Sequence, residues 1–177
     1  MKSSNIIVLR LLVGLLLIEL IILCGFFNPD SQYVFRSESL AVPDPVEVPS
    51  DVRSLLANDV DIQHVLRAEQ ITSNTIPKDW LIATLIPIRD TTAKLYLIIA
   101  KGPLAGAHGT TFWLIREMPR RGNTKILLVV TADQLEISLD STSPYPHVIA
   151  IQLTGTSISR LSYVYANGEY KPAGISK

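Results

Sequence analysis

Residues 102–116 have the sequence GPLAGAHGTTFWLIR, in which a glycine-rich loop runs directly into an aromatic and aliphatic stretch. The three glycines tolerate the positive φ values that tight turns require. Threonine, phenylalanine, tryptophan and isoleucine favour the extended backbone of a strand. Runs of similar composition lie on both sides of this stretch, so it predicts a β-rich domain with residues 102–116 near its middle.

Strand-like runs, rich in β-branched and aromatic residues, follow Pro77. They cover residues 81–88, 95–100, 111–116, 125–131, 134–139, 148–154 and 157–165. Short segments with turn-forming residues join them, which predicts antiparallel neighbours, because a parallel crossover needs about a dozen residues or more. Asn167-Gly168 is the strongest hairpin signal, since both residues tolerate positive φ. It predicts that residues 169–171 fold back onto residues 163–165.

The apolar patterns indicate which strands are covered. Residues 95–100 and 126–130 are apolar on both faces, which predicts central strands covered on both sides. Residues 134–139 alternate between apolar and polar, which predicts one solvated face. Residues 50–67 have helical spacing with Ser50 as a candidate N-cap, while Asn58-Asp-Val-Asp61 is weakly helical and offers a break in the helix. The predicted fold class is α+β, with one helix packed on a meandering antiparallel β-sheet of about six to eight strands.

The N-terminal part has a different composition. Residues 6–27, IIVLRLLVGLLLIELIILCGFF, are about as long as a helix that crosses a bilayer. Lys2 and Arg10 place the N-terminus in the cytoplasm and the remainder outside. A signal-anchor and a cleaved signal peptide both stay open, and the lack of an A-x-A-like site after the run favours the anchor. We therefore divide the chain into residues 1–27 as signal-anchor or signal peptide, 28–49 as a proline-rich tether, and 50–177 as a single extracytoplasmic domain.

Charge and cysteine content exclude some classes of partner. Lys and Arg together number 16, as do Asp and Glu, so the formal net charge is zero. Because a general nucleic-acid binder needs an excess of cations, we expect no nucleic-acid partner. Cys24 is the only cysteine and lies in the apolar run, so the predicted domain has no disulfide and no cysteine metal site. The expected partners are the membrane, through residues 6–27, and another envelope protein.

The residues show no catalytic signature such as G-x-S-x-G, and no carboxylate pair has the spacing of an acid/base couple. The histidines at 64, 108 and 147 form no paired-ligand motif, so we expect neither a metal nor a cofactor. The glycine-rich loop precedes a strand rather than a helix, which argues against a phosphate site. Three candidates for binding a ligand or partner remain: His108 in the loop, Trp113 in the strand after it, and Tyr145 in the tyrosine-rich C-terminal part.

Four motifs together resemble a loose group of small, uncharacterised secreted or envelope-attached bacterial domains. They are GAHGTTFWL at 106–114, the leucine-rich strand at 126–130, PYPHVI at 144–149 and YVYANGEY at 163–170. That group has a Gly-Ala-Asn-x-x-x-Phe-Trp loop and strand, and a closing hairpin with aromatic residues around an Asp-Gly turn. This chain departs from it with His108 in place of Asn and Asn167 in place of Asp. The resemblance implies a secreted bacterial β-rich fold and no particular reaction.

These observations predict a membrane-anchored or secreted protein of the bacterial envelope, with a non-catalytic interaction or structural domain. Its expected location is the inner membrane, facing the periplasm, or the periplasm itself if the signal is cleaved. The alternative is a small extracytoplasmic hydrolase that uses His108 with a nearby acid. That alternative requires a carboxylate or hydroxyl within hydrogen-bond reach of the His108 ring.

Overall fold

The computed structural model describes residues 32–39, 41–72, 75–106, 109–118, 123–139 and 143–176. The predicted signal-anchor or signal peptide lies outside these residues. Within the ranges described, no helix is both long and apolar enough to span a membrane. The chain from Gln32 onward makes one compact unit, and the architecture below is that of this unit.

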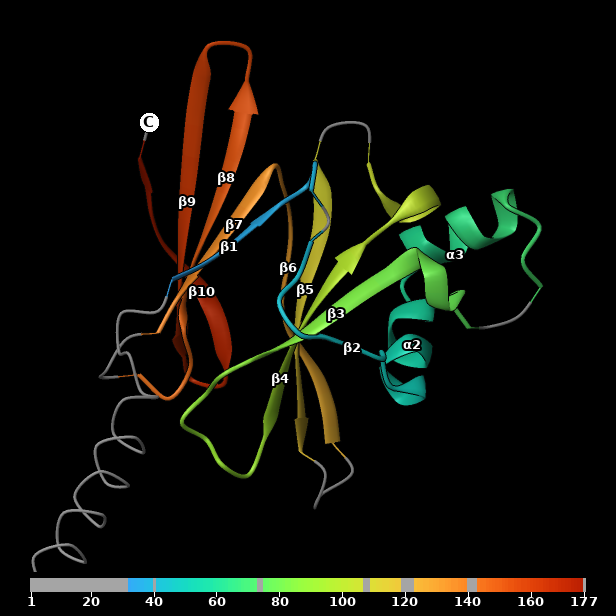
Figure 1. Ribbon diagram of the computed structural model, residues 1–177, viewed down its shortest axis with the longest axis horizontal. Helices are drawn as coiled ribbons and strands as arrows, with labels where there is room; N and C mark the ends of the chain where they lie inside the picture. The colour runs from blue at the N-terminus through green and yellow to red at the C-terminus, as the bar shows by residue number, and fades with distance from the viewer. Residues whose placement is uncertain are drawn as a thin grey trace, which may run out of the picture. The chain divides into compact units, whose positions relative to one another are not determined.

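The described residues form ten strands in two five-stranded antiparallel sheets (Figure 1). Sheet A has the strand order β1-β7-β8-β9-β10, and sheet B has the order β2-β3-β4-β5-β6. Each sheet is therefore a meander of four consecutive strands with one earlier strand added at its margin. The bounds are β1 Gln32–Arg36, β2 Pro45–Val46, β3 Leu81–Ile86, β4 Lys94–Ala100, β5 Thr110–Met118, β6 Asn123–Ala132, β7 Gln134–Ser138, β8 His147–Thr154, β9 Ser157–Ala166 and β10 Glu169–Ser176.

Two α-helices, α2 (Ser50–Ala57) and α3 (Val60–Ala68), occur where one was predicted. The break has a local cause, because Asp59 is the N-cap of α3. Its carboxylate accepts hydrogen bonds from the backbone N–H groups of Asp61 at 2.9 Å and Ile62 at 3.3 Å, which satisfies donors at the start of a new helix. Ser50 begins α2 without acting as its cap. Two short 3₁₀ helices, η1 (Lys78–Trp80) and η2 (Gly102–Leu104), flank the β3–β4 pair.

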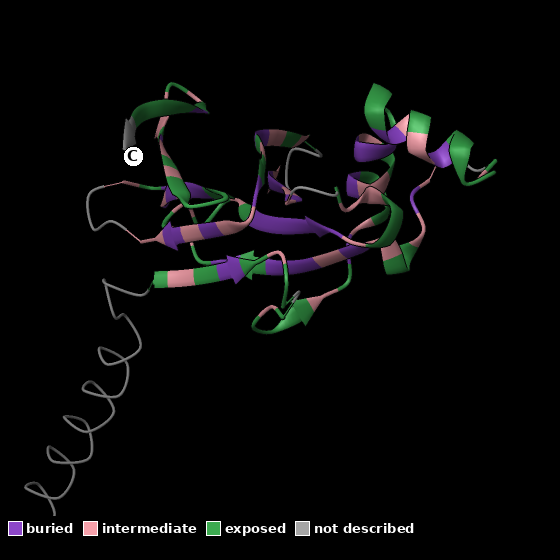
Figure 2. Cartoon of the chain, turned by 90° about the horizontal axis from the view of Figure 1, so that it is seen from above, coloured by how far each residue is buried: buried purple, intermediate pink, exposed green. Residues whose placement is uncertain are grey.

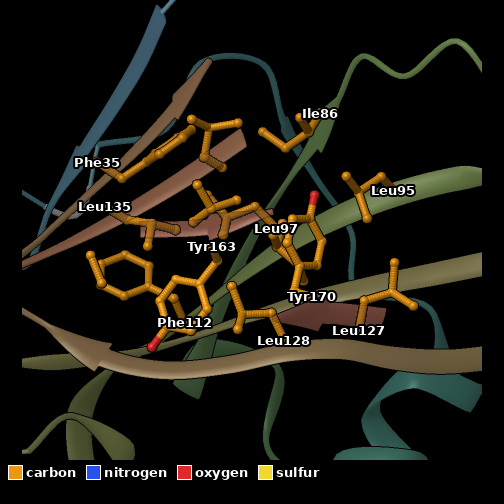
Figure 3. Close-up of a cluster of buried hydrophobic side chains, with 14 of the residues drawn as sticks. Phe35, Ile86, Leu95, Leu97, Phe112, Leu127, Leu128, Leu135, Tyr163 and Tyr170 are labelled. Carbon is orange, nitrogen blue, oxygen red and sulfur yellow. The ribbon is translucent and has the colours of Figure 1, made fainter. Parts of the chain in front are cut away.

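Sheet B lies between sheet A and the helices, and it buries apolar side chains on both faces. One core fills the space between the two sheets (Figure 3) and includes Phe35, Leu97, Phe112, Leu114, Leu135 and Tyr163. The second core lies between sheet B and the helices and includes Val52, Leu56, Ile98, Trp113 and Ile115. Each large apolar side chain that is fully buried contributes roughly 1.5–3 kcal/mol. Buried residues accordingly concentrate in the strands and on the inner faces of the helices (Figure 2).

Several sequence predictions are confirmed. Residues 95–100 of β4 are buried on both faces, as expected for a covered central strand. In β7, Leu135 and Ile137 are buried while their neighbours are partly exposed. The Asn167-Gly168 turn has φ values of 54° and 88°, and it pairs Tyr170 with Tyr165.

Three predictions need correction. The predicted single sheet is two sheets, because the chain passes from sheet B to sheet A between β6 and β7. The prediction that residues 126–130 form a covered central strand is wrong, because β6 is the last strand of sheet B and Val129 is 53% exposed. The predicted tether, residues 28–49, contains β1 and β2, and Phe35 of β1 is 1% exposed in the core. Strands β1 and β2 are therefore part of the fold.

The passage between the sheets is a tight corner at Asp133, the single residue between β6 and β7. Its N–H donates to the Ile151 carbonyl at 2.9 Å, and its carbonyl accepts from the Ser37 N–H at 2.9 Å. Its carboxylate accepts from the Leu153 N–H at 2.6 Å. Gly109 lies against this corner with φ +99°, and a Cβ there would meet the Ala132 carbonyl carbon and oxygen at 2.9 Å. The corner therefore requires glycine at position 109.

Replacing Gly109 by alanine should destabilise the fold through both the backbone conformation and the contact with Ala132. We expect the free energy of unfolding to fall by roughly 2–5 kcal/mol, from about 1–2 for the left-handed backbone and about 1–3 for the overpacking. Gly155→Ala is the matched control, because Gly155 has φ +58° and nothing within 4 Å of an added Cβ. Urea unfolding of both variants tests this, and equal losses for the two would contradict it.

Candidate functional site

The predicted site residues have different environments. His108 lies outside the described residues, so the hydrolase hypothesis that depends on it stays a prediction. Trp113 lies in β5 and is 4% exposed, with its ring in the core beneath the helices, while the adjacent Phe112 points into the core between the sheets. Trp113 is therefore not a surface residue, although it also contributes to the wall of a cavity described below.

Tyr145 is part of a buried aromatic cluster rather than a surface. Its ring stacks on Tyr165 with centroids 4.1 Å apart, and Tyr165 meets Tyr170 edge-on at 5.5 Å. The Tyr145 hydroxyl donates to the Asp90 carboxylate at 3.4 Å, and burial raises the pKa of Tyr145. Stacked rings of this kind stabilise packing. This cluster joins the loop before β4 to the β9–β10 hairpin, and we interpret it as structural.

Strand β6 forms an open edge of sheet B, where main-chain groups can bind another chain. Strand β6 pairs with β5 along Asn123–Ala132, and no described strand pairs with its other side. Its second half, LVVTA at 128–132, is uncharged and rich in β-branched residues. Alternate N–H and C=O groups of an edge strand point away from its neighbour and can pair with another chain.

The other three sheet edges are protected against such pairing. Strand β2 is two residues long and begins with Pro45. Strand β10 contains Lys171 and Pro172 and has a register shift between Pro172 and Gly174. Strand β1 has five residues, and Arg36 at its end bonds to the Gln134 side chain. Short edges, proline, charge and bulges all hinder edge-to-edge pairing. Residues 128–132 contain no proline and no charged residue, and the register shift of β6, at Leu127, lies just before them.

Two cavities flank this half of β6, one on each face of sheet B. The helix-side cavity, about 200 Å³, lies between β5, β6 and α3, and Val129 and Trp113 line it. The sheet-side cavity, about 210 Å³, lies between β6 and the β8–β9 hairpin, and Val130 and Tyr163 line it. Successive residues of a strand point to opposite faces. Residues 129 and 130 therefore face different cavities from adjacent positions on one edge.

The two cavities differ in polarity. Asp59 and Asp61 line the helix-side cavity, and no basic residue does. Thr111 and Thr131 share a hydrogen bond there, with 3.1 Å between their hydroxyl oxygens. The sheet-side cavity has no charged side chain, and Gln152 at its wall donates to the Thr131 carbonyl at 3.2 Å.

Acidic groups continue along the helix side of sheet B beyond the cavity. The Asp51 carboxylate accepts from the Thr124 hydroxyl at 2.8 Å, and the Glu117 carboxylate accepts from the Tyr96 hydroxyl at 2.9 Å. Burial first, then the Glu117 hydrogen bond and the negative charges of Glu117 and Asp51, raise the pKa of Tyr96 to about 12. Burial is the largest of these causes, and the carboxylates of Glu117 and Asp51 add to it.

The stability of the chain should depend on Tyr96 at high pH. Its pKa rises from 10.0 to about 12 on folding. Because the folded value is the higher one, the stabilisation from the neutral phenol is complete below pH 10 and is lost as the pH rises through 12. The difference between the ultraviolet titration curves of the unaltered chain and of Tyr96→Phe isolates the Tyr96 phenol. The variant Glu117→Gln should lower the pKa of Tyr96. Ionisation of Tyr96 near pH 10 would contradict the described environment.

No protein-family model, curated protein or solved structure shows a significant match to this chain. The geometry of the β6 edge is therefore the basis on which a function can be proposed. Sequence reasoning missed this site because the run at 125–131 has the composition of a covered strand. The one local signal was Asp133 directly after it, a residue that favours turns.

Proposed function

We propose that this chain is a non-catalytic interaction domain of the bacterial envelope, and that it binds an extended segment of a partner protein along β6. The observation that carries the proposal is the unprotected stretch 128–132, flanked by one cavity on each face of the sheet. A segment added there as a strand would pair with the outward main-chain groups of β6. Its alternate side chains would then enter the two cavities.

At the β6 edge, the size of the two cavities favours this mode over small-molecule binding. Each holds about 200–210 Å³, below the roughly 300–1,000 Å³ typical of ligand pockets. Such volumes suit single side chains. Main-chain hydrogen bonds would supply affinity, and the two cavities would supply selectivity.

The proposed location rests on the sequence. Residues 6–27 are long and apolar enough to hold the domain at a membrane, and Lys2 and Arg10 favour an extracytoplasmic domain. Cleavage after this run would instead release the domain to the periplasm. The binding edge would serve the same purpose in either form.

Val129→Lys should weaken binding without unfolding the chain. Val129 is 53% exposed on the helix side of the edge, where a lysine would hinder a docking strand, because lysine on an edge strand opposes pairing. Leu85→Lys is the matched control, because Leu85 is 43% exposed on the same face of β3. The measurement is the affinity of segments selected from a library of short unstructured peptides displayed on phage, using the purified full chain in mild detergent.

We expect selected peptides to bind the unaltered chain and Leu85→Lys alike, and to bind Val129→Lys at least about tenfold more weakly. Thermal unfolding of both variants should match that of the unaltered chain within a few degrees. Equal binding to both variants, or a library that yields no binder, would contradict the proposed function.

A further inference from the structure

We infer that the segment bound on β6 alternates basic and aliphatic side chains, with the basic ones on the helix side and the aliphatic ones in the sheet-side cavity. This inference rests on the proposed function and names the chemistry of the partner. It follows from the different lining of the two cavities and from the alternation that an added strand imposes.

The helix side offers negative charge that no described ion pair neutralises. Asp59 and Asp61 are both exposed at the cavity, and the described ion pairs, Lys78–Glu47 and Lys171–Glu169, include neither. The Asp59 carboxylate caps α3, and Lys125, the basic residue of β6, is turned the other way, since its Nζ donates to the Gly168 carbonyl at 3.2 Å. Among the described residues, a lysine or arginine of a docked strand would therefore meet an acidic surface whose cavity lining includes no basic side chain.

The sheet-side cavity favours an aliphatic side chain over a charged one. Val130, Ala150, Leu161 and Tyr163 form an apolar wall, and the polar residues of the lining are Thr131, Gln152 and Ser159. A charged side chain placed there would lose hydration without gaining a partner of opposite charge. An aliphatic side chain of the added strand would extend the core between the two sheets.

A second copy of the chain fits this edge less well. Antiparallel pairing of two β6 edges about a two-fold axis would continue one sheet across both copies and leave their helices on the same face. The acidic groups beside each edge, Asp51, Asp59 and Asp61, would then approach their counterparts. Like charges brought together across an interface oppose association, which favours a basic segment as the occupant.

Four nine-residue peptides test the inference. The parent alternates lysine with valine, the second has threonine for lysine, and the third has glutamate for lysine. The fourth is the parent with N-methyl groups on two adjacent central residues, one lysine and one valine, which keeps the charges but removes a main-chain donor from each edge of the peptide strand. Binding is followed by calorimetry and by Trp113 fluorescence in the purified full chain carrying Trp80→Phe, because Trp80 and Trp113 are its two tryptophans.

We expect the lysine peptide to bind about tenfold more tightly than the threonine peptide, and the glutamate peptide to bind most weakly. The N-methylated peptide should not bind, because it cannot pair with β6. The double variant Asp59→Asn, Asp61→Asn should reduce the preference for lysine to about threefold or less, since asparagine keeps the cap of α3 while removing the charge.

The outcomes that would overturn this inference alone differ from the outcome that would also overturn the proposed function. Equal affinity for the lysine and threonine peptides, with loss on N-methylation, would overturn the inference and leave the proposed function standing. Equal affinity for the parent and N-methylated peptides would overturn strand addition and the proposed function with it. A dimer in sedimentation that Val129→Lys converts to a monomer would show that a second copy occupies the edge, which also overturns the inference.

Discussion

The corner at Asp133 is the constraint on which the rest of the structure depends. One residue carries the chain from the last strand of sheet B to the second strand of sheet A, and three hydrogen bonds to Ile151, Ser37 and Leu153 hold it. This corner brings the two meanders face to face, so their apolar faces form a common core. Gly109 gives it room, because any side chain there would press on the Ala132 main chain.

The same corner accounts for the open edge of β6. Because the next strand leaves for the other sheet, no neighbour in the meander covers the outer side of β6. The helices cover one face of sheet B and sheet A covers the other, which leaves a cavity on each side of the edge. The proposed binding mode is thus a consequence of how the two sheets are connected, together with the acidic residues on the helix side.

Local patterns predicted most strands after Pro77 correctly and did not predict how the strands assemble. A few adjacent residues determine the buried strand β4, the half-buried strand β7 and the Asn167-Gly168 turn. The sequence therefore predicts all three correctly. The division into two sheets depends on where β7 pairs, with β1 on one side and β8 on the other, and no local pattern encodes this. Similarly, 126–130 has the composition of a covered strand, and only the long-range topology makes it an edge.

For the candidate residues, too, local sequence patterns do not show which distant residues lie beside them. Trp113 was chosen for its place beside the glycine-rich loop, and it does line a cavity, but the neighbours that give the cavity its character come from α3 and β6. Asp59 and Asp61 were unremarkable in the sequence, since acidic residues at a helix start usually serve the helix itself. Tyr145 was chosen from a tyrosine-rich region, where packing between strands explains the composition.

Amide hydrogen exchange along β6, followed by NMR in the purified full chain, tests the open edge most directly. Alternate amides within 128–132 should exchange at least about 100-fold faster than those of 95–99 in β4, which pair with strands on both sides. Addition of a bound peptide should slow those same amides. Uniform protection of residues 128–132 at the level of β4, in the chain without peptide, would contradict an open edge and the binding mode built on it.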